Sequence, residues 1–534
     1  MTGGMRLFVG IASVGTVAAL ASLSAQGPPA ATVRQVAYIK ASNAQASDHF
    51  GCGGVLDGHA GYGAAISGDG KTMAIASPHE DSAAKGINGR QNDNSADESG
   101  AVYVFVLDSR GRWVQQAYVK PSNTVEDMEF GHAVVLSADG NTLAVSAFWE
   151  PSNATGINGN QADTSIPQAG AAYVFTRTGV TWSQQAYIKA SNTGEAGTAD
   201  TFPDGDQFGV SLAISDDGNT IAVGAFSEDS GATGINGDQA DNSVNLSGAV
   251  YVFRRGGTTW TQQAYIKPHN TGGGDMFGYA LALSANGDTL VTSGYDEDGP
   301  SRGIDGESGN QRPNAGAVYV FQRANGIWSQ QSYLHPHNSE NGDQFGVSLG
   351  ISDDGNTLLV GSLDEDCLAT GVNPPGCDND FAADISTGAA YVFVRNGPLW
   401  SQQAFLKASN TGHHDWFGSR LALSGDGNVA ALGASIEDSA GTGINGKQDD
   451  DSATDAGAVY LFRRTGATWA QQAYIKGAQN EAYDEFGGSV ALSGDGKTLV
   501  ASAHGDDGNG RGPYANERSK GASESGAIYV FSVN

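Results

Sequence analysis

The sequence is poor in charged residues and in cysteine. Only 16% of its 534 residues are charged, and 28 Lys and Arg face 58 Asp and Glu, which leaves a net charge of −30. Phosphate backbones and anionic lipid repel so acidic a chain, so its composition argues against nucleic acid or a membrane surface as a partner. The three Cys form no CxxC or Cys/His spacing of a zinc site.

Motifs of the common catalytic centres are missing as well. There is no HExxH, GxSxG or GxxxxGK[ST]. The ten His are scattered, and the clusters His335-Pro336-His337 and His413-His414-Asp415 each occur once. We therefore predict that the protein is not an enzyme. A carboxylate pair that acts as acid and base remains an alternative, because carboxylates are plentiful.

A long apolar run occurs only at the N-terminus, where Arg6 precedes a stretch from Leu7 to Leu23 without an acidic residue. This pattern predicts a signal peptide over residues 1–25, cleaved near Ser24 or Ala25, and a short linker over 26–32. An uncleaved membrane anchor is the alternative. We expect a secreted, periplasmic or cell-surface protein that is not inserted in the membrane after cleavage. In that compartment, Cys367 and Cys377 could form a local disulfide.

Glycine is abundant, with 77 residues, and an internal repeat covers nearly all of the remaining chain. A block W-x-Q-Q-[AS]-[YF]-[IVL] recurs every 68 to 78 residues, beginning at Trp113, Trp182, Trp260, Trp328, Trp400 and Trp469. Repeats of this length indicate that one supersecondary unit is stacked many times.

Each unit contains four strand-like runs. In the clearest unit these are FGVSLAIS (208–215), TIAVGAF (220–226), GAVYVFRR (248–255) and WTQQAYIK (260–267). The Asp217-Gly218 and Gly256-Gly257 steps between them suit tight hairpins. Four short antiparallel strands in each repeat are typical of a β-propeller blade.

Counting the units predicts the number of blades. The third-strand motif occurs seven times, at Tyr103, Tyr173, Tyr251, Tyr319, Tyr391, Tyr460 and Tyr529. The last copy has no fourth strand after it, but residues 35–40, QVAYIK, match that strand. We therefore predict an all-β fold over residues 33–534: a seven-bladed propeller whose N-terminal strand completes the last blade. In the irregular first unit, Ala60-Gly61 is expected to take the Phe-Gly place.

These residues resemble a known family. Phe-Gly at the start of the first strand, followed by an apolar second strand and Gly-Ala-Val-Tyr-Val-Phe, looks like the FG-GAP repeat of integrin α-subunit propellers and of bacterial exported proteins. The resemblance implies a seven-bladed propeller that binds protein or glycan partners, often with bound calcium.

The integrin-type calcium loop lies between the first and second strands, but here that connection, 215–220, is too short and is expected to be a hairpin turn. Acidic residues gather instead between the second and third strands, where carboxylates and Gly suit Ca²⁺. A solvated loop held by Asx turns is the alternative. The candidate calcium ligands are Glu80, Asp81, Asp93, Glu228, Asp229, Asp238, Asp241, Glu437, Asp438, Asp449 and Asp451.

Other repeated residues are expected to serve the fold. The Asp before Phe-Gly (Asp206, Asp275, Asp343, Asp415 and Asp484) is predicted to accept hydrogen bonds, and the repeated Trp to pack the blades. A Lys ends the outer strand at Lys40, Lys120, Lys189, Lys267, Lys407 and Lys476. There it is expected to be exposed and to discourage edge pairing with other chains.

In an antiparallel meander the long connections all lie on one face, and variable loops on a rigid scaffold are where binding usually occurs. We therefore expect a non-catalytic, adhesion-type propeller that recognises an extracellular protein or glycan through its acidic loops, stabilised by calcium if those loops bind it. The alternatives are a structural calcium-binding envelope or matrix protein, and a hydrolase or lyase that uses the central channel.

Overall fold

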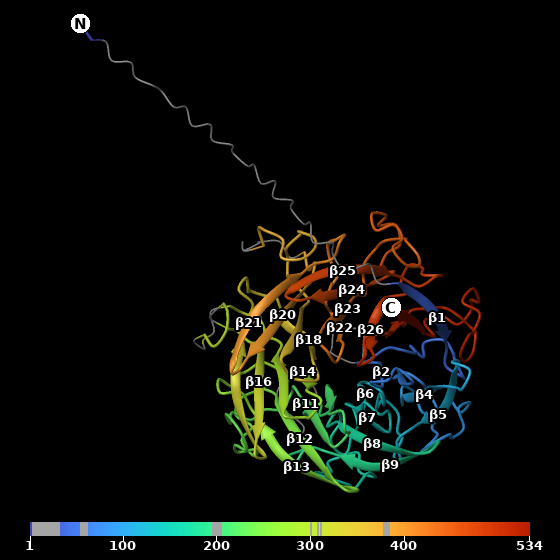
Figure 1. The fold of residues 1–534 in the computed structure, drawn as a ribbon. Coiled ribbons are helices and arrows are strands. Elements are labelled where there is room, and N and C mark those ends of the chain that lie inside the picture. Colours follow the sequence, from blue (N-terminus) through green and yellow to red (C-terminus); the bar gives the residue numbers. More distant parts are fainter. Residues whose placement is uncertain are drawn as a thin grey trace. The chain divides into compact units, whose positions relative to one another are not determined.

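The computed structural model describes residues 1–2, 32–53, 62–194, 205–299, 302–306, 309, 312–377 and 385–534. Within these residues every regular element is a β-strand, and the strands form seven four-stranded antiparallel sheets in one compact unit, Ala31–Asn534 (Figure 1). The part of the chain described here has no helix that could span a bilayer. The predicted signal peptide and linker lie almost entirely outside the described residues.

The sheets are the blades of a propeller, numbered here in chain order. Blade 1 contains β2 (Ala64–Ile66), β3 (Thr72–Ser77), β4 (Ala101–Leu107) and β5 (Trp113–Val119). Blade 2 contains β6 (Val134–Leu136), β7 (Thr142–Ala147), β8 (Ala171–Thr178) and β9 (Thr181–Ile188). Blade 3 contains β10 (Leu212–Ile214), β11 (Thr220–Ala225), β12 (Ala249–Gly256) and β13 (Thr259–Ile266). Blade 4 contains β14 (Phe277–Leu283), β15 (Thr289–Gly294), β16 (Ala317–Ala324) and β17 (Ile327–Leu334).

The remaining blades follow the same order. Blade 5 contains β18 (Phe345–Ile351), β19 (Thr357–Ser362), β20 (Ala389–Asn396) and β21 (Leu399–Leu406). Blade 6 contains β22 (Arg420–Leu423), β23 (Val429–Ala434), β24 (Ala458–Thr465) and β25 (Thr468–Ile475). Blade 7 contains β26 (Phe486–Leu492), β27 (Thr498–Ala503) and β28 (Ala527–Val533), and takes β1 (Val33–Ile39) as its outer strand.

The N-terminal strand closes the ring, as the repeat count predicted. β1 pairs antiparallel with β28, from Val33 opposite Val533 to Ile39 opposite Ile528. Beyond these strands, Thr32 and Asn534 exchange backbone hydrogen bonds of 3.0 and 3.2 Å. The two ends of the propeller are thus held by a full strand pairing, which leaves blade 7 as complete as the others.

The Phe-Gly signature joins neighbouring blades. Phe208 packs edge-on against Tyr251 of its own blade, with ring centroids 5.3 Å apart. Gly209 has a φ of 106°, and a Cβ there would lie 2.9 Å from the Cβ of Ser146 in blade 2. Only glycine fits this close approach with this backbone conformation.

In blade 1 the Phe-Gly place belongs to Phe50-Gly51. Phe50 lies 5.4 Å from Tyr103, which matches the contact of Phe208 in blade 3. The prediction that Ala60-Gly61 takes this place is therefore wrong. Counting back from the turn failed because the insertion follows Phe-Gly; residues 54–61 of that insertion lie outside the described part.

The short turns between first and second strands form a ring around the axis. Each is a hairpin, as predicted: the Ser215 hydroxyl donates to Asp217 (2.6 Å) and accepts from the Thr220 backbone N–H (3.0 Å). Backbone N–H groups of these turns also donate from blade to blade, at 2.8 to 3.4 Å. The donors, each bonded to the next blade's turn, are Gly68, Ala138, Asp216, Ala285, Asp353, Gly425 and Asp495. The last bond returns to Gly68, so seven bonds make a closed circle.

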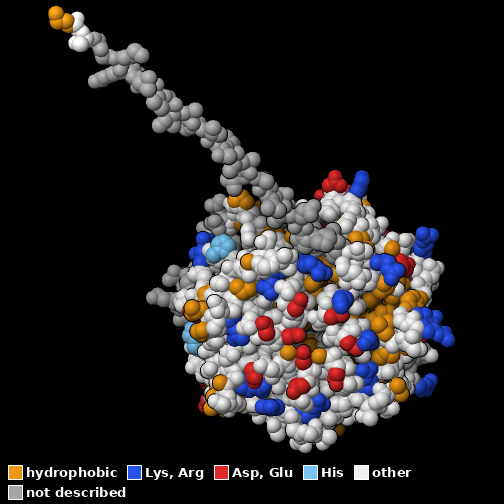
Figure 2. All heavy atoms as spheres, viewed as in Figure 1, with side chains coloured by type: hydrophobic (Ala, Val, Ile, Leu, Met, Phe, Trp, Pro, Cys, Tyr) orange, Lys and Arg blue, Asp and Glu red, His pale blue; other side chains and the backbone are white. Residues whose placement is uncertain are grey.

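Figure 2 shows one face of the propeller, on which Asp and Glu side chains gather around the centre and Lys and Arg side chains lie further out. This is the arrangement of the short-turn face. Its inner turns carry Asp217 and its equivalents, and Arg255 and its equivalents lie behind them, where Arg255 donates to Asn219 at 2.9 Å. The long connections between strands lie on the opposite face, because the strands are antiparallel.

The axis contains an apolar cavity of about 260 Å³, lined by the first strands of all seven blades. Tyr62, which precedes β2 in blade 1, reaches across it: the Tyr62 hydroxyl accepts a 3.4 Å hydrogen bond from the backbone N–H of Leu349 in blade 5. The side chains that line this cavity are uncharged, and one aromatic side chain bridges it.

Candidate functional site: the long-loop face

The loops between second and third strands cover a layer of buried ion pairs. Each pair joins the acid that follows the second strand to the Lys that ends the outer strand of the same blade, at 2.6 to 3.1 Å. The pairs are Glu80–Lys120, Glu150–Lys189, Glu228–Lys267, Glu365–Lys407, Glu437–Lys476 and Asp506–Lys40. All six Lys side chains are 0% exposed. The prediction that these Lys protect an exposed edge is wrong, because the long loop folds over them.

Blade 3 shows how completely the acid is used. Glu228 accepts hydrogen bonds from the amide of Asn192 (3.1 Å) and the hydroxyl of Tyr265 (2.7 Å) on Oε1. Its Oε2 accepts from Lys267 (2.9 Å) and from the backbone N–H of Ser230 (3.1 Å). A carboxylate offers about four lone-pair sites, and all four are occupied. Burial lowers the pKa of Lys267, and the negative charge of Glu228 opposes that shift.

The other predicted calcium ligands lie in different positions of the loop. Asp229 is half-buried and ties the loop together, since its Oδ1 accepts the backbone N–H of Leu246 at 2.8 Å. Asp238 is exposed and caps its own turn by accepting from Ala240 (3.0 Å). Asp241 does the same for Ser243 (3.1 Å). The eleven carboxylates thus divide into buried ion-pair partners, half-buried loop ties and outer Asp residues, and calcium binding by these loops stays a prediction.

Four of the predicted residues do share a cavity between the loops of blades 5 and 6. It measures about 680 Å³ and is lined by Glu437, Asp438, Asp449 and Asp451, together with His413 and Asp415. Glu437 is occupied by Lys476 at 2.7 Å and by the Tyr474 hydroxyl at 3.0 Å. The remaining acids face this polar space.

Blade 4 departs from the pattern, because His335 stands where the other blades have Lys. Its ring is 1% exposed, and burial lowers its pKa to about 4. A Cβ on Gly299 would lie 2.3 Å from the ring, so the residue opposite the imidazole has to be glycine. The partner acid Glu297 accepts instead from Tyr333 (2.8 Å) and Tyr319 (3.0 Å).

The Asp before Phe-Gly accepts hydrogen bonds from the preceding turn, as predicted. Asp343, Asp415 and Asp484 each accept a backbone N–H three residues earlier in the chain, at 2.7 Å. Burial raises the pKa of Asp415 and of Asp484 to about 7, and the turn hydrogen bond opposes the shift.

The repeated Trp is a blade-packing residue, which confirms that prediction. Trp260 is 3% exposed, lies under the guanidinium of Arg255 at 5.3 Å, and donates through Nε1 to Gln185 of blade 2 at 2.9 Å. Arg255 donates to the same Gln185 oxygen at 3.2 Å. In five of the six W-x-Q-Q blocks the second Gln accepts in this way from the Trp and the Arg of the next blade, which we call an Arg–Trp–Gln clasp.

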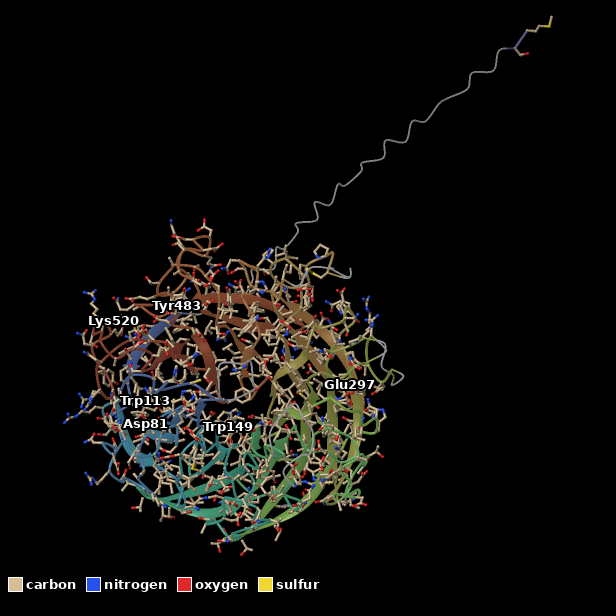
Figure 3. All side chains as sticks on the ribbon, turned by 180° about the vertical axis from the view of Figure 1, so that it is seen from behind. Asp81, Trp113, Trp149, Glu297, Tyr483 and Lys520 are labelled. Carbon is tan, nitrogen blue, oxygen red and sulfur yellow. A yellow bond between two sulfur atoms is a disulfide. The ribbon has the colours of Figure 1, made fainter. Side chains whose placement is uncertain are left out.

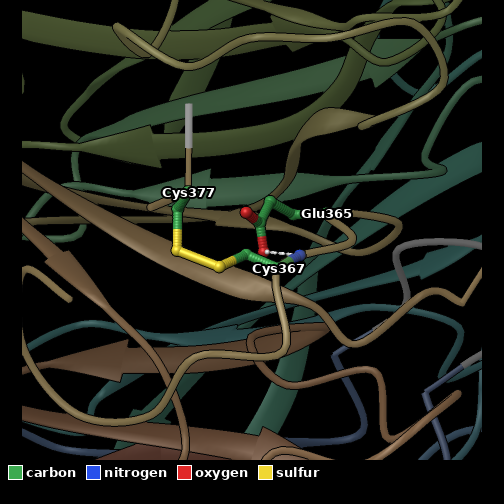
Figure 4. A group of neighbouring side chains, drawn as sticks. All are labelled: Glu365, Cys367 and Cys377. Atoms are coloured by element: carbon green, nitrogen blue, oxygen red, sulfur yellow. Dashed lines mark hydrogen bonds between the residues drawn. A yellow bond between two sulfur atoms is a disulfide. The ribbon is translucent and has the colours of Figure 1, made fainter. Parts of the chain in front are cut away.

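The predicted disulfide between Cys367 and Cys377 is present, and Figure 4 shows it beside Glu365. The backbone N–H of Cys367 donates to Glu365 Oε2 at 3.2 Å. Because both sulfurs are bonded to each other, this group of side chains offers no thiolate to a metal ion. The third cysteine, Cys52, is buried elsewhere.

A second layer lies nearer the axis, where neighbouring blades meet. A junction is the place where one blade meets the next, and two residues lie side by side there. The first stands two positions before the Gly-Ala that opens the third strand of one blade. The second stands directly before the Phe-Gly of the next blade. These fourteen residues have φ between 43° and 56°, and none of them is glycine. At six junctions the second residue donates its backbone N–H to the carbonyl of the first, at 3.0 to 3.2 Å. The left-handed backbone costs about 1–2 kcal/mol for each non-glycine residue, yet a side chain is kept at every position.

The side chains of these junction pairs do not repeat. From junction 1/2 to junction 7/1, the pairs are Glu98–Glu129, Gln168–Gln207, Leu246–Met276, Asn314–Gln344, Ser386–Trp416, Asp455–Glu485 and Glu524–His49. Residues just after the second strand vary too, and they approach the axis: Figure 3 shows Trp149 of blade 2 nearer the centre of the ring than Asp81 or Trp113.

Histidines and carboxylates gather at three adjacent junctions around blades 7 and 1. His504 lies 2.8 Å from Glu485, and His49 lies 3.5 Å from Glu524. The His49 ring is 4.9 Å from that of His79 and 6.2 Å from that of His504. Burial and the two neighbouring imidazoles lower the pKa of His49 to about 3. We call His49, His79, His504 and their Glu partners the histidine arc.

The histidine arc was not predicted, because its members are far apart in the chain. His49, His79 and His504 each stand alone in the sequence, so no cluster of adjacent His residues points to them. An alignment of the seven repeats could have identified them. His79 and His504 follow a second strand, and His49 precedes Phe-Gly, at positions where the other units have unrelated residues.

Comparison with known proteins supports the repeat. The FG-GAP repeat matches residues 260–321, 400–462 and 469–531. Each segment runs from the outer strand of one blade to the third strand of the next. A comparison with curated proteins found no match.

Among solved structures, hydrazine synthase of Kuenenia stuttgartiensis is similar at 15% identity and a TM-score of 0.42, over 84% of this chain and 96% of that one. The periplasmic gluconolactonase PpgL of Pseudomonas aeruginosa is similar at 14% identity and a TM-score of 0.42, over 84% and 97% of the two chains.

Proposed function

We propose that this FG-GAP repeat β-propeller protein is an exported, non-catalytic binding protein whose long-loop face recognises an extracellular protein or glycan. One observation carries the proposal: the sevenfold repeat is kept where residues support the fold and is broken where they surround the axis on the long-loop face. The Arg–Trp–Gln clasps and the Lys–Glu pairs recur in most blades, whereas the seven junction pairs all differ.

The surface offers features suited to recognition. Trp416 and Met276 are half-buried apolar side chains at junctions 5/6 and 3/4, and Gln207 and Gln344 at the neighbouring junctions carry amides. Exposed carboxylates, such as Asp238 and Asp449, surround them on the long loops. Aromatic and amide groups inside a polar rim are the composition of binding surfaces in general. The left-handed backbone fixes the direction of these side chains before a partner arrives, and an inter-blade backbone hydrogen bond supports it at Gln207, Met276 and Gln344.

The test needs a change on each face of the ring. Mature protein would be passed over immobilised cell-surface polysaccharides and secreted proteins by surface plasmon resonance. For a partner that binds wild type, Trp416→Ala should weaken binding at least about tenfold, as truncation of a central aromatic anchor does. Lys71→Ala, an exposed change on the short-turn face, should leave the affinity unchanged.

Two outcomes would overturn the proposal. One is a partner whose affinity falls with Lys71→Ala and not with Trp416→Ala, since recognition would then use the opposite face. The other is the absence of binding across both classes of ligand while the protein is folded by circular dichroism. Neither variant touches the histidine arc, so this test is independent of the inference that follows.

A further inference from the structure

At junction 1/2 three potential metal ligands converge. His79, Glu98 and Glu129 each place one ligand atom within 4.8 Å of the other two. His79 and Glu98 come from the long loop of blade 1, and Glu129 from the residue before Phe-Gly of blade 2. The three therefore join two blades.

Glu129 is the feature that the fold does not explain. Its side chain is 1% exposed, and its Oε2 has no hydrogen-bond partner. Among the described residues, no Lys or Arg forms an ion pair with it, whereas the nearby buried Glu80 has Lys120 at 3.1 Å. Burial and the neighbouring Glu98 and Asp127 raise the pKa of Glu129 to about 8. A buried, unpaired carboxylate oxygen is costly, and it is normally compensated by a cation or by hydrogen bonds.

The backbone fixes the three ligands in position. Glu98 and Glu129 have φ of 45° and 47°, and the N–H of Glu129 donates to the carbonyl of Glu98 at 3.0 Å. The N–H of Glu98 is held in turn by Asp81 at 3.1 Å. Only side-chain torsions remain to be adjusted when a ligand binds.

We propose that His79, Glu98 and Glu129 bind a divalent first-row transition ion such as Zn²⁺. One imidazole nitrogen and two carboxylate oxygens are a mixed donor set that Zn²⁺ accepts at about 2.0–2.2 Å. Ligand atoms around a tetrahedral ion lie about 3.4 Å apart at such bond lengths, so the side chains must close by no more than about 1.5 Å. Three protein ligands leave one position open, at the face that we assign to the partner.

Other junctions show why this one is distinct. At junction 2/3 the equivalent residues Gln168 and Gln207 satisfy each other, because Gln207 Nε2 donates to Gln168 Oε1 at 3.2 Å. At junction 6/7 the acid Glu485 already pairs with His504 at 2.8 Å. Calcium and magnesium prefer all-oxygen ligands, so His79 selects against both ions.

The test uses tagless mature protein stripped with EDTA and titrated with Zn²⁺ by isothermal calorimetry. Wild type should bind one Zn²⁺ that the double variant Glu98→Gln/Glu129→Gln loses, with at least about a hundredfold weaker affinity for that site. The variant should fold, because it copies the amide pair of junction 2/3. The control Asp238→Asn/Asp241→Asn also removes two negative charges, but from a loop without histidine, and it should bind Zn²⁺ as wild type does.

A second readout identifies the ligands. Co²⁺ bound at the site should give visible d–d absorption that the variant His79→Gln alters or loses. The proposal is overturned if wild type binds no Zn²⁺, if the Glu98→Gln/Glu129→Gln variant binds as tightly as wild type, or if Ca²⁺ competes with Zn²⁺ at equal concentration. None of these results depends on a partner, so they can fail or succeed separately from the proposed function.

Discussion

The buried pair Glu228–Lys267 gives the sharpest test of what the acidic loops do. If the Glu228 carboxylate is the ion-pair partner of Lys267 rather than a calcium ligand, then Lys267→Met should destabilise the protein whether or not calcium is present. The Lys ammonium lies 2.9 Å from Glu228 Oε2 and 2.7 Å from the Ser247 hydroxyl, with 0% and 1% exposure of the two charged side chains. Removal of one member of such a pair leaves a buried charge unpaired and costs about 3–5 kcal/mol.

That cost can be converted into a melting temperature. Unfolding entropy is about 2.1 cal/mol/K for each residue, so a propeller of roughly 500 residues that melts as one unit loses about 4 °C for 4 kcal/mol. Glu228→Gln should fall by a similar amount, because Lys267 is then left without its anion. The double variant should recover part of the loss, since the single Gln oxygen can still accept from Tyr265 and no charge is left unpaired.

Calcium separates the two interpretations. Wild type and the three variants of this cycle would be melted by differential scanning calorimetry in EDTA and again in millimolar Ca²⁺. An ion-pair role predicts the same losses in both buffers and a coupling energy of at least about 1.5 kcal/mol. The reasoning is refuted if Glu228→Gln matches wild type in EDTA and falls below it only with Ca²⁺, which would make Glu228 a calcium ligand.

Three further predictions follow from other features. The pKa of His335, about 4 in the folded protein against 6.5 in the unfolded chain, means that the stability from keeping it neutral is complete above pH 6.5 and is lost as the pH falls toward 4. The melting temperature of the variant His335→Lys minus that of wild type should therefore be about 2 °C higher at pH 5 than at pH 7. A difference between the two proteins that does not change with pH would contradict this. The variant Cys367→Ser/Cys377→Ser lacks the disulfide, which spans a sequence separation of 10, and its melting temperature should be about 3 °C lower than that of wild type. Dithiothreitol should lower the melting temperature of wild type by the same amount and leave that of the variant unchanged. Deletion of residues 1–40 removes β1, which leaves β28 with an open edge and Asp506 without Lys40; light scattering should show association of this variant, and a monomer of unchanged stability would argue against closure by pairing.

The sequence allowed the fold to be predicted because the repeat carries its own evidence. Each of the tight hairpins has its Gly, six of the seven blades have the repeated Trp and Gln, and the missing fourth strand of blade 7 appears at residues 35–40. Local patterns and long-range closure agree, so the number of blades follows from counting. Only blade 1 misled the alignment, since an insertion after Gly51 displaced the apparent start of its first strand.

The site could be predicted less well, because burial of a charged side chain is not visible in a sequence. Lys267 and Glu228 looked like an exposed cation and a calcium ligand, and their true relation depends on a loop that folds over both. The histidine arc depends on ring closure in addition, since His49 and His504 meet only when β1 joins β28. Periodicity shows which residues repeat, whereas a site is made by the residues that do not.

The circle of backbone hydrogen bonds around the short turns also limits how the molecule can move. Its seven bonds run head to tail, so no blade can leave the circle at that end unless two of them break. At the long-loop end the blades are joined by backbone hydrogen bonds as well, because Glu129 donates its N–H to the Glu98 carbonyl and Phe130 donates to Ser99, with equivalents at other junctions. Backbone hydrogen bonds thus join neighbouring blades at both ends, so the main chain sets the positions of the blades while the side chains at the junctions are left to vary.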